Sequence, residues 1–267
     1  MEIYELLSCT RWDPFLLNMG WNNDREDGQS SPFLLLHYHL ERLVNAADIH
    51  EWPTAKAALN LDDLRRRCLS TVDAARADEA DPPKALKLRI TVRKEGAITI
   101  TSAPIKPLLS DPTSATFFNP LTDSPSMFGP IQSIFIDTQP TTSSIHTFTK
   151  TTLRDHYDQA RSRAKIPSLT SPADVVLHNN QHLVTETSIS NVAVWRQKGY
   201  GSYWITPHTN TGCLPGVLRR WLLEQGRIRE AMPNDDLSLE RIRPGDWLLL
   251  FNGVHGCRLG RVEGGGS

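Results

Sequence analysis

The stretch IHTFTKTTLRDHYDQA, residues 145–160, decides how the rest of the chain is interpreted, because it carries a single lysine between two local patterns. A Ser/Thr-rich segment of extended character comes before Lys150. After it, apolar residues recur at the spacing of a helix: Leu153, Tyr157, Ala160 and Ala164. The sequence therefore predicts Lys150 at a strand-to-helix junction, at the mouth of the helix.

A lysine in that place has three interpretations. Its ammonium group can bind an anion, because helix N-termini attract negative charge. A desolvated lysine can instead form a Schiff base. The third interpretation, and the commonest for a lone lysine near a helix start, is a solvated surface residue. The choice between them depends on residues elsewhere in the chain.

The composition favours a protein that acts on a small molecule. The chain has 267 residues and a formal net charge of −1, so neither nucleic acid nor an anionic membrane is an expected partner. The start, MEIYELLS, lacks the features of a signal peptide, and the longest apolar runs are too short to span a bilayer. We therefore expect a soluble, cytoplasmic protein. Four cysteines without a CxxC pair predict reduced thiols and no metal site, and the terminal GGGS is expected to be flexible.

The first 103 residues are predicted to form a small α/β domain. Its expected elements are a strand within 3–11, a polar loop at 22–31, a helix over 36–47 closed by Pro53, a helix over 61–75 and a β-hairpin over 85–104. The hairpin is indicated by β-branched residues on both sides of a Glu95, Gly96 turn.

Residues 104–130 are rich in Pro, Ser and Thr without a period, which predicts an interdomain linker. A second, larger α/β domain is expected from 131 to 267. Its predicted elements are strands at 131–137, 173–179, 182–195 and 202–207, a helix with Pro215 in its first turn, and a last strand at 246–252. Two unlike domains with an active-site cleft between them are therefore the expected architecture.

Three further positions have both a functional and an ordinary interpretation. Glu186 lies in a strand pattern on the same face as neighbouring valines if the strand is unbroken, and a carboxylate there needs a cationic partner because its desolvation is costly. Gly216 begins a helix whose N–H groups can hold a phosphate. Arg42 lies on an amphipathic helix. The ordinary alternative for Glu186 is a glutamate on an edge strand, facing water or paired with an arginine. For Gly216 it is a Pro-Gly turn, and for Arg42 a solvated side chain.

Taken together, four motifs resemble the class IV, or branched-chain aminotransferase-like, fold of pyridoxal-phosphate enzymes: HYHLERLVNAA, FTKTTLRDHYDQAR, VTETSISNV and LPGV, in that order. The resemblance covers nearly the whole chain and is weakest in the first 30 residues and in the linker. It implies an α/β fold with a small N-terminal and a larger C-terminal domain, and pyridoxal 5′-phosphate as the cofactor.

The resemblance also implies roles for the residues singled out above. Lys150 would be the catalytic lysine that forms the Schiff base, Glu186 the partner of the pyridinium nitrogen, and Arg42 a ligand of the phosphate. The physical interpretation of Glu186 agrees, because a protonated pyridinium supplies the buried cation that its carboxylate needs.

Residues of the C-terminal domain complete the cofactor site that the resemblance implies. Val217 and Leu218 would donate backbone N–H groups to the phosphate, and Leu214 would pack on the cofactor ring. Asn252, in the last segment, is placed with the cofactor-binding residues.

Two branches of this family, the aminotransferases and the 4-amino-4-deoxychorismate lyases, are separated by three features. Asp155 stands five residues after the lysine, where transaminases of this class often have tyrosine, and Arg154 stands four after it, as in many lyases. The segment NGVHGCRLGRV resembles the Asn-x-x-Arg-Gly segment of the lyases, from which His255 departs by replacing the arginine. The residues KTTLRDHYDQAR and the Pro-rich insertion most resemble fungal lyases.

The lyase interpretation implies conversion of 4-amino-4-deoxychorismate to 4-aminobenzoate and pyruvate, in folate biosynthesis, by a homodimer. Lys150 would remove the proton at C4, and the enolpyruvyl group would leave from C3. Both substrate carboxylates need cationic partners, for which Arg93, on a predicted hairpin strand, and Arg154 are the candidates. Surface salt bridges are the alternative for both arginines.

Two other function classes remain. A class IV aminotransferase acting on branched-chain amino acids, D-amino acids or amines would share every cofactor residue and differ only in the substrate pocket. A non-catalytic binding protein ranks last, because Lys150 and Glu186 are both present.

Overall fold

The computed structural model describes residues 4–23, 28–77, 79–198, 201–232, 235 and 237–264. The chain divides into two compact units. One runs to Asp111 and also contains Thr149–Leu153, and the other contains Pro112–Phe148 and the residues from Arg154 onward. Part of the predicted loop at 22–31 and the last three residues of the terminal GGGS lie outside the described residues.

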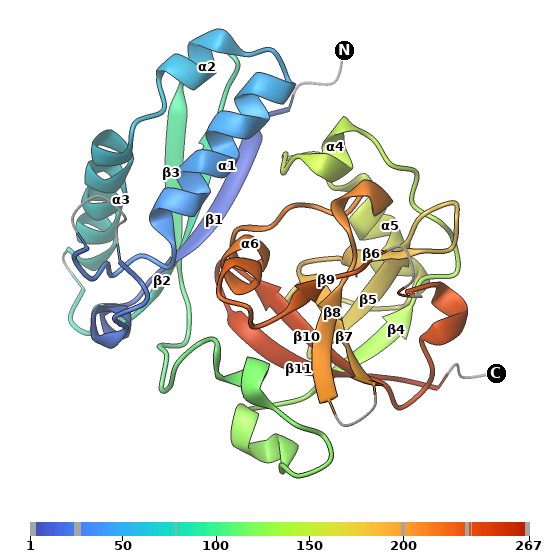
Figure 1. Ribbon diagram of the computed structural model, residues 1–267. Helices are drawn as coiled ribbons and strands as arrows, with labels where there is room; N and C mark the ends of the chain where they lie inside the picture. The colour runs from blue at the N-terminus through green and yellow to red at the C-terminus, as the bar shows by residue number, and fades with distance from the viewer. Residues whose placement is uncertain are drawn as a thin grey trace. The chain divides into compact units, whose positions relative to one another are not determined.

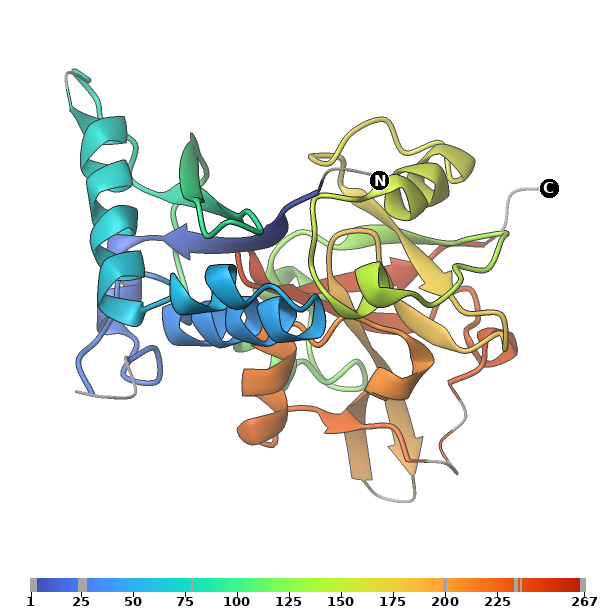
Figure 2. The same ribbon diagram turned by 90° about the horizontal axis from the view of Figure 1, so that it is seen from above.

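The first unit is a three-stranded antiparallel sheet with helices on one face (Figure 1). In the order β1-β2-β3 its strands are Leu6–Trp12, Leu86–Val92 and Ile98–Pro104. The helices are α1 (Leu36–Ile49), α2 (Pro53–Ala57) and α3 (Leu61–Arg76), and η1 (Pro14–Asn18) is a 3-10 turn. Helix α1 lies along β1, as Figure 1 and Figure 2 both show.

Alternation along β2 explains why the helices pack on one face of this sheet. Leu86, Leu88, Ile90 and Val92 are fully buried and belong to one apolar cluster with residues of α1 and α3. Side chains of a strand point alternately to the two faces, so these four share a face. The predicted strand within 3–11, the helices over 36–47 and 61–75, and the hairpin are confirmed.

Local capping fixes where the helices begin. The Asn60 side chain accepts hydrogen bonds from the backbone N–H groups of Asp62 and Asp63, which satisfies two donors that a helix N-terminus leaves unpaired. Pro53 was expected to close a helical segment, and this prediction is wrong. It stands in the first turn of α2, where its fixed φ and missing N–H are tolerated.

The segment that carries Lys150 pairs with β1. The Leu7 N–H donates to the Lys150 carbonyl (2.8 Å), the Thr152 N–H donates to the Glu5 carbonyl (2.9 Å), and Thr151 forms an antiparallel bridge with Leu6. Lys150 is therefore in extended backbone, held through its own carbonyl.

The prediction that Lys150 lies at the mouth of a helix is wrong. A short helix, α4 (Ile145–Phe148), precedes it, and α5 (Asp155–Arg163) begins only five residues later. The reason is the pairing with β1, which helical periodicity in residues 153–164 cannot reveal, because the partner strand is far away in the sequence.

The second unit contains an eight-stranded mixed sheet in the order β6-β5-β4-β11-β10-β7-β8-β9. Its strands are β4 (Gln132–Ile136), β5 (Ala173–His178), β6 (Val184–Thr187), β7 (Asn191–Lys198), β8 (Gly201–Thr206), β9 (Arg229–Glu230), β10 (Trp247–Asn252) and β11 (Gly256–Val262). Besides α4 and α5 it contains α6 (Val217–Glu224) and the 3-10 turns η2 (Ser114–Phe117), η3 (Pro125–Phe128), η4 (Thr209–Thr211) and η5 (Leu239–Arg241).

The sheet of the second unit has apolar residues on both faces, as β5 shows. Val176 belongs to a cluster with residues of β4, β7, β10 and β11, whereas Val175 and Leu177 pack with Tyr157 and Ala160 of α5. A strand that is buried on both faces has consecutive apolar residues in its sequence. The run of apolar residues in ADVVLH therefore predicted this strand. This packing positions α5 against the sheet.

Two predictions in this unit are wrong. Residues 182–195 are not one strand, because Ser188–Ser190 form a turn between β6 and β7 in which the Thr187 hydroxyl and N–H both donate to the Ser190 carbonyl. Hydroxyl side chains offer the backbone such local alternatives to a strand. Pro215 is not in the first turn of α6, since Gly216 is the N-cap and Val217 the first helical residue.

Residues 112–130, part of the predicted linker, pack on the second unit. The Trp204 indole N–H donates to the Thr116 carbonyl (3.1 Å), and the Cys257 N–H donates to the Pro112 carbonyl (2.6 Å). The Phe118 ring lies 4.8 Å from the ring of Trp247. The boundaries of domains at 103 and 131 remain a prediction.

Candidate functional site

The residues predicted to bind cofactor or substrate are distributed over both units. Arg42, Arg93 and Lys150 belong to the first unit. The second unit contains the others: Arg154, Glu186, Leu214, Val217, Leu218 and Asn252. No helix of the described residues is long and apolar enough to cross a bilayer, and no acidic, His or Cys cluster in them is suited to a metal ion.

Arg42, on α1, is a half-buried arginine with a buried Nε atom, and the described residues satisfy its guanidinium only in part. Its Nη2 donates to the Ser8 hydroxyl at 2.5 Å, while its Nε has no hydrogen-bond partner among the described residues. Burial lowers the pKa of Arg42 to about 10, against a small opposite effect of Cys9. A buried cation without a carboxylate beside it is suited to an anion that comes from a ligand.

Ser8 and His39 lie next to the Arg42 guanidinium, and neither was predicted from the sequence. The Ser8 hydroxyl and His39 Nδ1 are 2.7 Å apart, and both side chains are fully buried. Burial holds the pKa of His39 well below its ordinary value, helped by the charges of Arg42 and Lys150. His39 is therefore neutral, and Lys150 lies near enough for its charge to lower the pKa of His39. The signal for His39 was its place one helical turn before Arg42.

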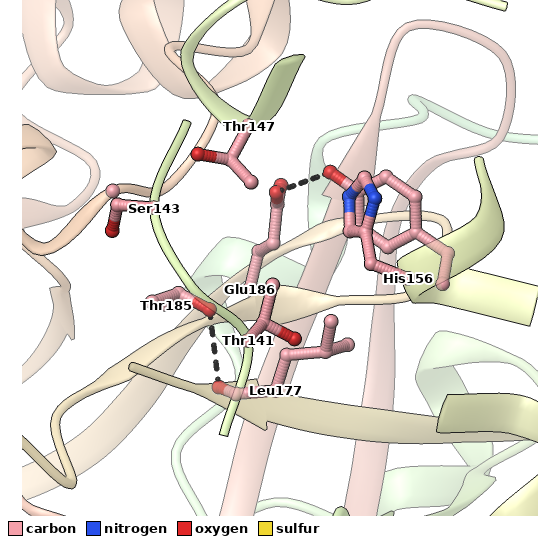
Figure 3. A pocket seen from close by; sticks show the side chains of 9 residues that line it. Thr141, Ser143, Thr147, His156, Leu177, Thr185 and Glu186 are labelled. Atoms are coloured by element: carbon pink, nitrogen blue, oxygen red, sulfur yellow. Dashed lines mark hydrogen bonds between the residues drawn. The ribbon is translucent and has the colours of Figure 1, made fainter. Parts of the chain in front are cut away.

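Glu186, on β6, is a buried carboxylate with two described hydrogen-bond donors. The Tyr157 hydroxyl donates to its Oε1 at 2.6 Å, and Asn191 Nδ2 approaches its Oε2 at 3.5 Å. Its side chain borders a small pocket in the second unit, with a cavity volume of about 10 Å³. Figure 3 shows the carboxylate directed toward that pocket, with Thr147 and His156 beside it. The pocket is lined by Thr141, Ser143, Thr147, His156, Tyr157, Leu177, Thr185, Glu186 and Gly212.

Asn191 connects Glu186 with the start of α6, and sequence reasoning missed it too. Besides approaching Glu186, its Nδ2 donates to the Leu214 carbonyl at 2.7 Å. A Cβ atom added at Gly216 would lie 1.9 Å from Asn191 Oδ1, so any other residue there would displace the Asn191 amide. The predicted phosphate-binding helix start thus lies beside the predicted partner of the ring nitrogen.

Helix α6 begins without a side-chain cap from any described residue, because its N-cap is Gly216. The first N–H groups of a helix have no partner within the helix, so those of Val217 and Leu218 can donate to an anion. Leu214, which precedes the helix, is buried. These three residues keep the roles predicted for them, as proposals.

Asn252, at the end of β10, has contacts of its own. Its Nδ2 donates to the Ile189 carbonyl (3.2 Å) and the Ser190 hydroxyl (3.1 Å). Its Oδ1 accepts from the N–H groups of Val254 (3.0 Å) and His255 (2.8 Å). These four bonds use both donors and both acceptor positions of the amide. Asn252 thus fixes the β10–β11 turn, and its contact with the cofactor remains a prediction.

The two candidate substrate arginines differ in their surroundings. Arg93 lies after the end of β2, not on the strand as predicted, and forms an exposed ion pair with Glu5 at 2.6 Å that lowers the pKa of that carboxyl group. Arg154, the N-cap of α5, donates from Nη2 to the Ser188 carbonyl at 2.9 Å. The contact of either arginine with substrate remains a prediction.

The family model for class IV amino-transferases matches residues 26–260. The chain belongs to the class IV aminotransferase family. The predicted family and α/β fold class are thereby confirmed, and enzymes of this family depend on pyridoxal phosphate.

Relatives of this class IV chain are found among fungal proteins. It is 33% identical to the aminodeoxychorismate lyase of Saccharomyces cerevisiae over 196 residues, which are 66% of this chain and 51% of the yeast protein. It is 28% identical to a protein of Schizosaccharomyces pombe over 225 residues, 82% of this chain and 79% of that one. The chain therefore spans about half the length of the first relative.

Solved structures of the class share the fold. The branched-chain amino acid aminotransferase of Escherichia coli is 12% identical, with a TM-score of 0.62 over 97% of this chain and 77% of that one. The 4-amino-4-deoxychorismate lyase of Pseudomonas aeruginosa is 15% identical, with a TM-score of 0.61 over 97% and 83%.

The described residues fit pyridoxal phosphate. Arg42 offers a buried guanidinium with an Nε atom that no described residue satisfies, which suits a phosphate. Gly216 leaves the start of α6 without a side-chain cap, so the first N–H groups of this helix can donate to a phosphate. Glu186 offers a buried carboxylate, which suits a protonated ring nitrogen.

Proposed function

We propose that this chain is a pyridoxal-phosphate-dependent lyase that converts 4-amino-4-deoxychorismate to 4-aminobenzoate and pyruvate. The observation that carries the proposal is its 33% identity to the Saccharomyces cerevisiae aminodeoxychorismate lyase. Asp155 and Arg154, which follow the lysine as in lyases of the class, support the same branch.

The proposed roles follow from the chemistry of the side chains. Pyridoxal phosphate, when bound, supplies an electron sink for a carbon next to the substrate amine. Arg42 would hold its phosphate and Glu186 its ring nitrogen. Lys150 would hold it covalently and, once displaced by the substrate amine, would take the proton from C4 of the substrate with Nζ.

The surroundings of Lys150 support this role. Its carbonyl is held by the Leu7 N–H, so its side chain can move while its backbone stays paired with β1. After the proton at C4 is removed, the enolpyruvyl group leaves from C3 and the remaining ring becomes aromatic. Aromatisation makes the reaction favourable without a second amino acceptor.

The direct test couples the chain to an enzyme that aminates chorismate with glutamine, and follows 4-aminobenzoate by its fluorescence. We expect steady product without any added amino donor or acceptor, and none from a Lys150→Ala control. Absence of product from the unmodified chain, together with steady transfer of an amino group from an amino acid to a keto acid, would contradict the proposal.

That last outcome would favour the second candidate, an aminotransferase, which the family as a whole also supports. A transaminase needs two substrates in turn, whereas the lyase needs one. The candidates therefore differ in whether a keto acid is required for turnover.

The proposal extends to the cellular role. We propose that the chain works as a cytoplasmic homodimer that supplies 4-aminobenzoate for folate biosynthesis, as the family resemblance implies. Light scattering of the cofactor-bound protein should give twice the 30.0 kDa of one chain. A mass of 30.0 kDa in the active protein would contradict the dimer.

A further inference from the structure

Tyr157 forms a short hydrogen bond with Glu186. Its hydroxyl donates to Glu186 Oε1 at 2.6 Å, and both side chains are buried. A hydrogen bond to an ionised carboxylate is short and strong, and it favours the ionised form. Burial, followed by the charge of Glu186, holds the pKa of Tyr157 well above its ordinary value, so the phenol keeps the proton that it donates.

The hydrogen bond of Asn191 with the other oxygen of Glu186 is longer. Asn191 Nδ2 lies 3.5 Å from Oε2, at the outer limit of a hydrogen bond, and donates at 2.7 Å to the Leu214 carbonyl instead. Of these two donors, Tyr157 therefore forms the shorter and stronger hydrogen bond with the carboxylate.

The Tyr157 ring has little freedom to move. It packs in an apolar cluster of the second unit whose other buried members are Ala160, Ile166, Val175 and Leu177. The His156 ring lies against it, with centroids 3.9 Å apart. A phenol fixed in this way delivers its hydroxyl to one place.

Arg154 also contacts the Tyr157 ring. Its Cζ lies 4.9 Å from the centroid of the Tyr157 ring, within the range of a cation–π contact. Its Nη2 donates to the carbonyl of Ser188, two residues after Glu186. One guanidinium thus ties the start of α5, which carries Tyr157, to the turn that ends the strand of Glu186.

We propose that Tyr157 is a positioning residue that keeps the Glu186 carboxylate ionised and in one orientation for the ring nitrogen of the cofactor, and that Arg154 acts by holding Tyr157. The inference rests on the proposed function, because it takes Glu186 as the partner of that nitrogen. It also gives Arg154 a role other than binding a substrate carboxylate.

The first test replaces Tyr157 by phenylalanine, which keeps the ring and removes the hydroxyl. Cofactor should still bind and be trapped on Lys150 by borohydride, while kcat falls about 10- to 100-fold with little change in KM, the cost of one charge-assisted hydrogen bond. Tyr203→Phe is the matched control, because Tyr203 is partly buried on β8, where it faces Arg229. It should keep the kcat of the unmodified chain.

A spectroscopic measurement separates positioning from mere packing. Without the Tyr157 hydroxyl, Glu186 becomes more basic and shares the proton of the ring nitrogen. The pH at which the visible absorbance of the bound cofactor changes should therefore rise by about 0.5 or more in Tyr157→Phe, and stay unchanged in Tyr203→Phe. This measurement needs no substrate, so it holds whether the reaction is a lyase or a transaminase reaction.

The second test is Arg154→Gln, at a partly exposed position. If Arg154 acts through Tyr157, kcat should fall by a smaller factor with KM nearly constant, and the double variant with Tyr157→Phe should be little worse than Tyr157→Phe alone. A KM raised about 10-fold or more, with kcat kept, would instead make Arg154 a substrate ligand and overturn its part of the inference.

The outcomes distinguish the inference from the proposed function. If the unmodified chain makes no 4-aminobenzoate but its bound cofactor responds to Tyr157→Phe as described, only the proposed reaction is wrong. If Tyr157→Phe folds, binds cofactor and matches Tyr203→Phe in kcat and in absorbance, the positioning role is wrong. Should Tyr157→Phe fail to fold, the same absorbance measurement on Arg154→Gln decides, with no shift counting against the role.

Discussion

Replacing Arg42 by methionine is expected to change the stability of the cofactor-free chain and its affinity for pyridoxal phosphate in opposite directions. The buried guanidinium has a pKa lowered to about 10, and its Nε has no described partner. That drop corresponds to about 3 kcal/mol lost by the charged form on burial. Methionine avoids this cost but loses the bond to Ser8, which contributes about 1 kcal/mol.

The net expectation is a cofactor-free Arg42→Met chain that is about 2 kcal/mol more stable, with a Tm about 4–6 °C higher. Because the folded-state pKa lies below the unfolded one, the cost of the charge is fully present below about pH 9 and fades as the pH rises past about 10. The gain should therefore be constant from about pH 6 to about pH 9. The Kd for pyridoxal phosphate should rise about 10- to 100-fold, since a charge-assisted contact is lost.

The assay is thermal unfolding of both proteins with and without cofactor, together with a titration followed by visible absorbance. Arg161→Met is the control, since Arg161 is a buried arginine that is paired with Asp174 at 3.4 Å. Its loss removes the ion-pair partner of the buried Asp174 carboxylate and should destabilise the chain by about 3–5 kcal/mol. If Arg42→Met is destabilised in the same way and its Kd is unchanged, Arg42 is a structural residue and the reasoning is refuted.

Lys150→Ala should abolish the borohydride-trapped adduct, and peptide mapping that finds the adduct on another lysine would contradict its role. Glu186→Gln should still bind cofactor through Lys150 but lose turnover by orders of magnitude, each factor of ten being about 1.4 kcal/mol of barrier; near-normal turnover would make Glu186 a mere strand residue. His39 is buried and neutral in the folded chain but takes up a proton in the unfolded chain below about pH 6.5. As the pH decreases from about 6.5, the free energy of unfolding should therefore decrease by up to about 1.4 kcal/mol per pH unit. Acid denaturation of His39→Gln should lack this contribution.

The elements with a local signal were predictable from the sequence. Helix α3 repeats its apolar residues at helical spacing and begins with an asparagine cap, and the β2–β3 hairpin has its turn at a glycine with φ of 88°. Such signals depend only on neighbouring residues. The family was also predictable, because its motifs around Lys150 and Glu186 are short and continuous in the chain.

What the sequence could not show depends on residues distant along the chain. The pairing of Lys150 with β1 joins positions about 140 residues apart, and no periodicity around the lysine reports it. The bond between Tyr157 and Glu186 joins a helix to a strand, so Tyr157 was recognised only as part of an apolar stripe. The predicted roles in binding cofactor and substrate remain predictions, because a binding site also brings together residues that are distant along the chain.

The pairing of residues 149–153 with β1 makes the chain suitable for fragment complementation, in which two separate pieces of a protein assemble. A cut between Asp111 and Pro112 would leave β1 on the N-terminal piece and Lys150 on the C-terminal piece, although both belong to one compact unit. Neither piece alone would contain the strand pair that holds the lysine. The yellow colour of bound pyridoxal phosphate would then report the moment at which two separately produced halves of the protein reassemble.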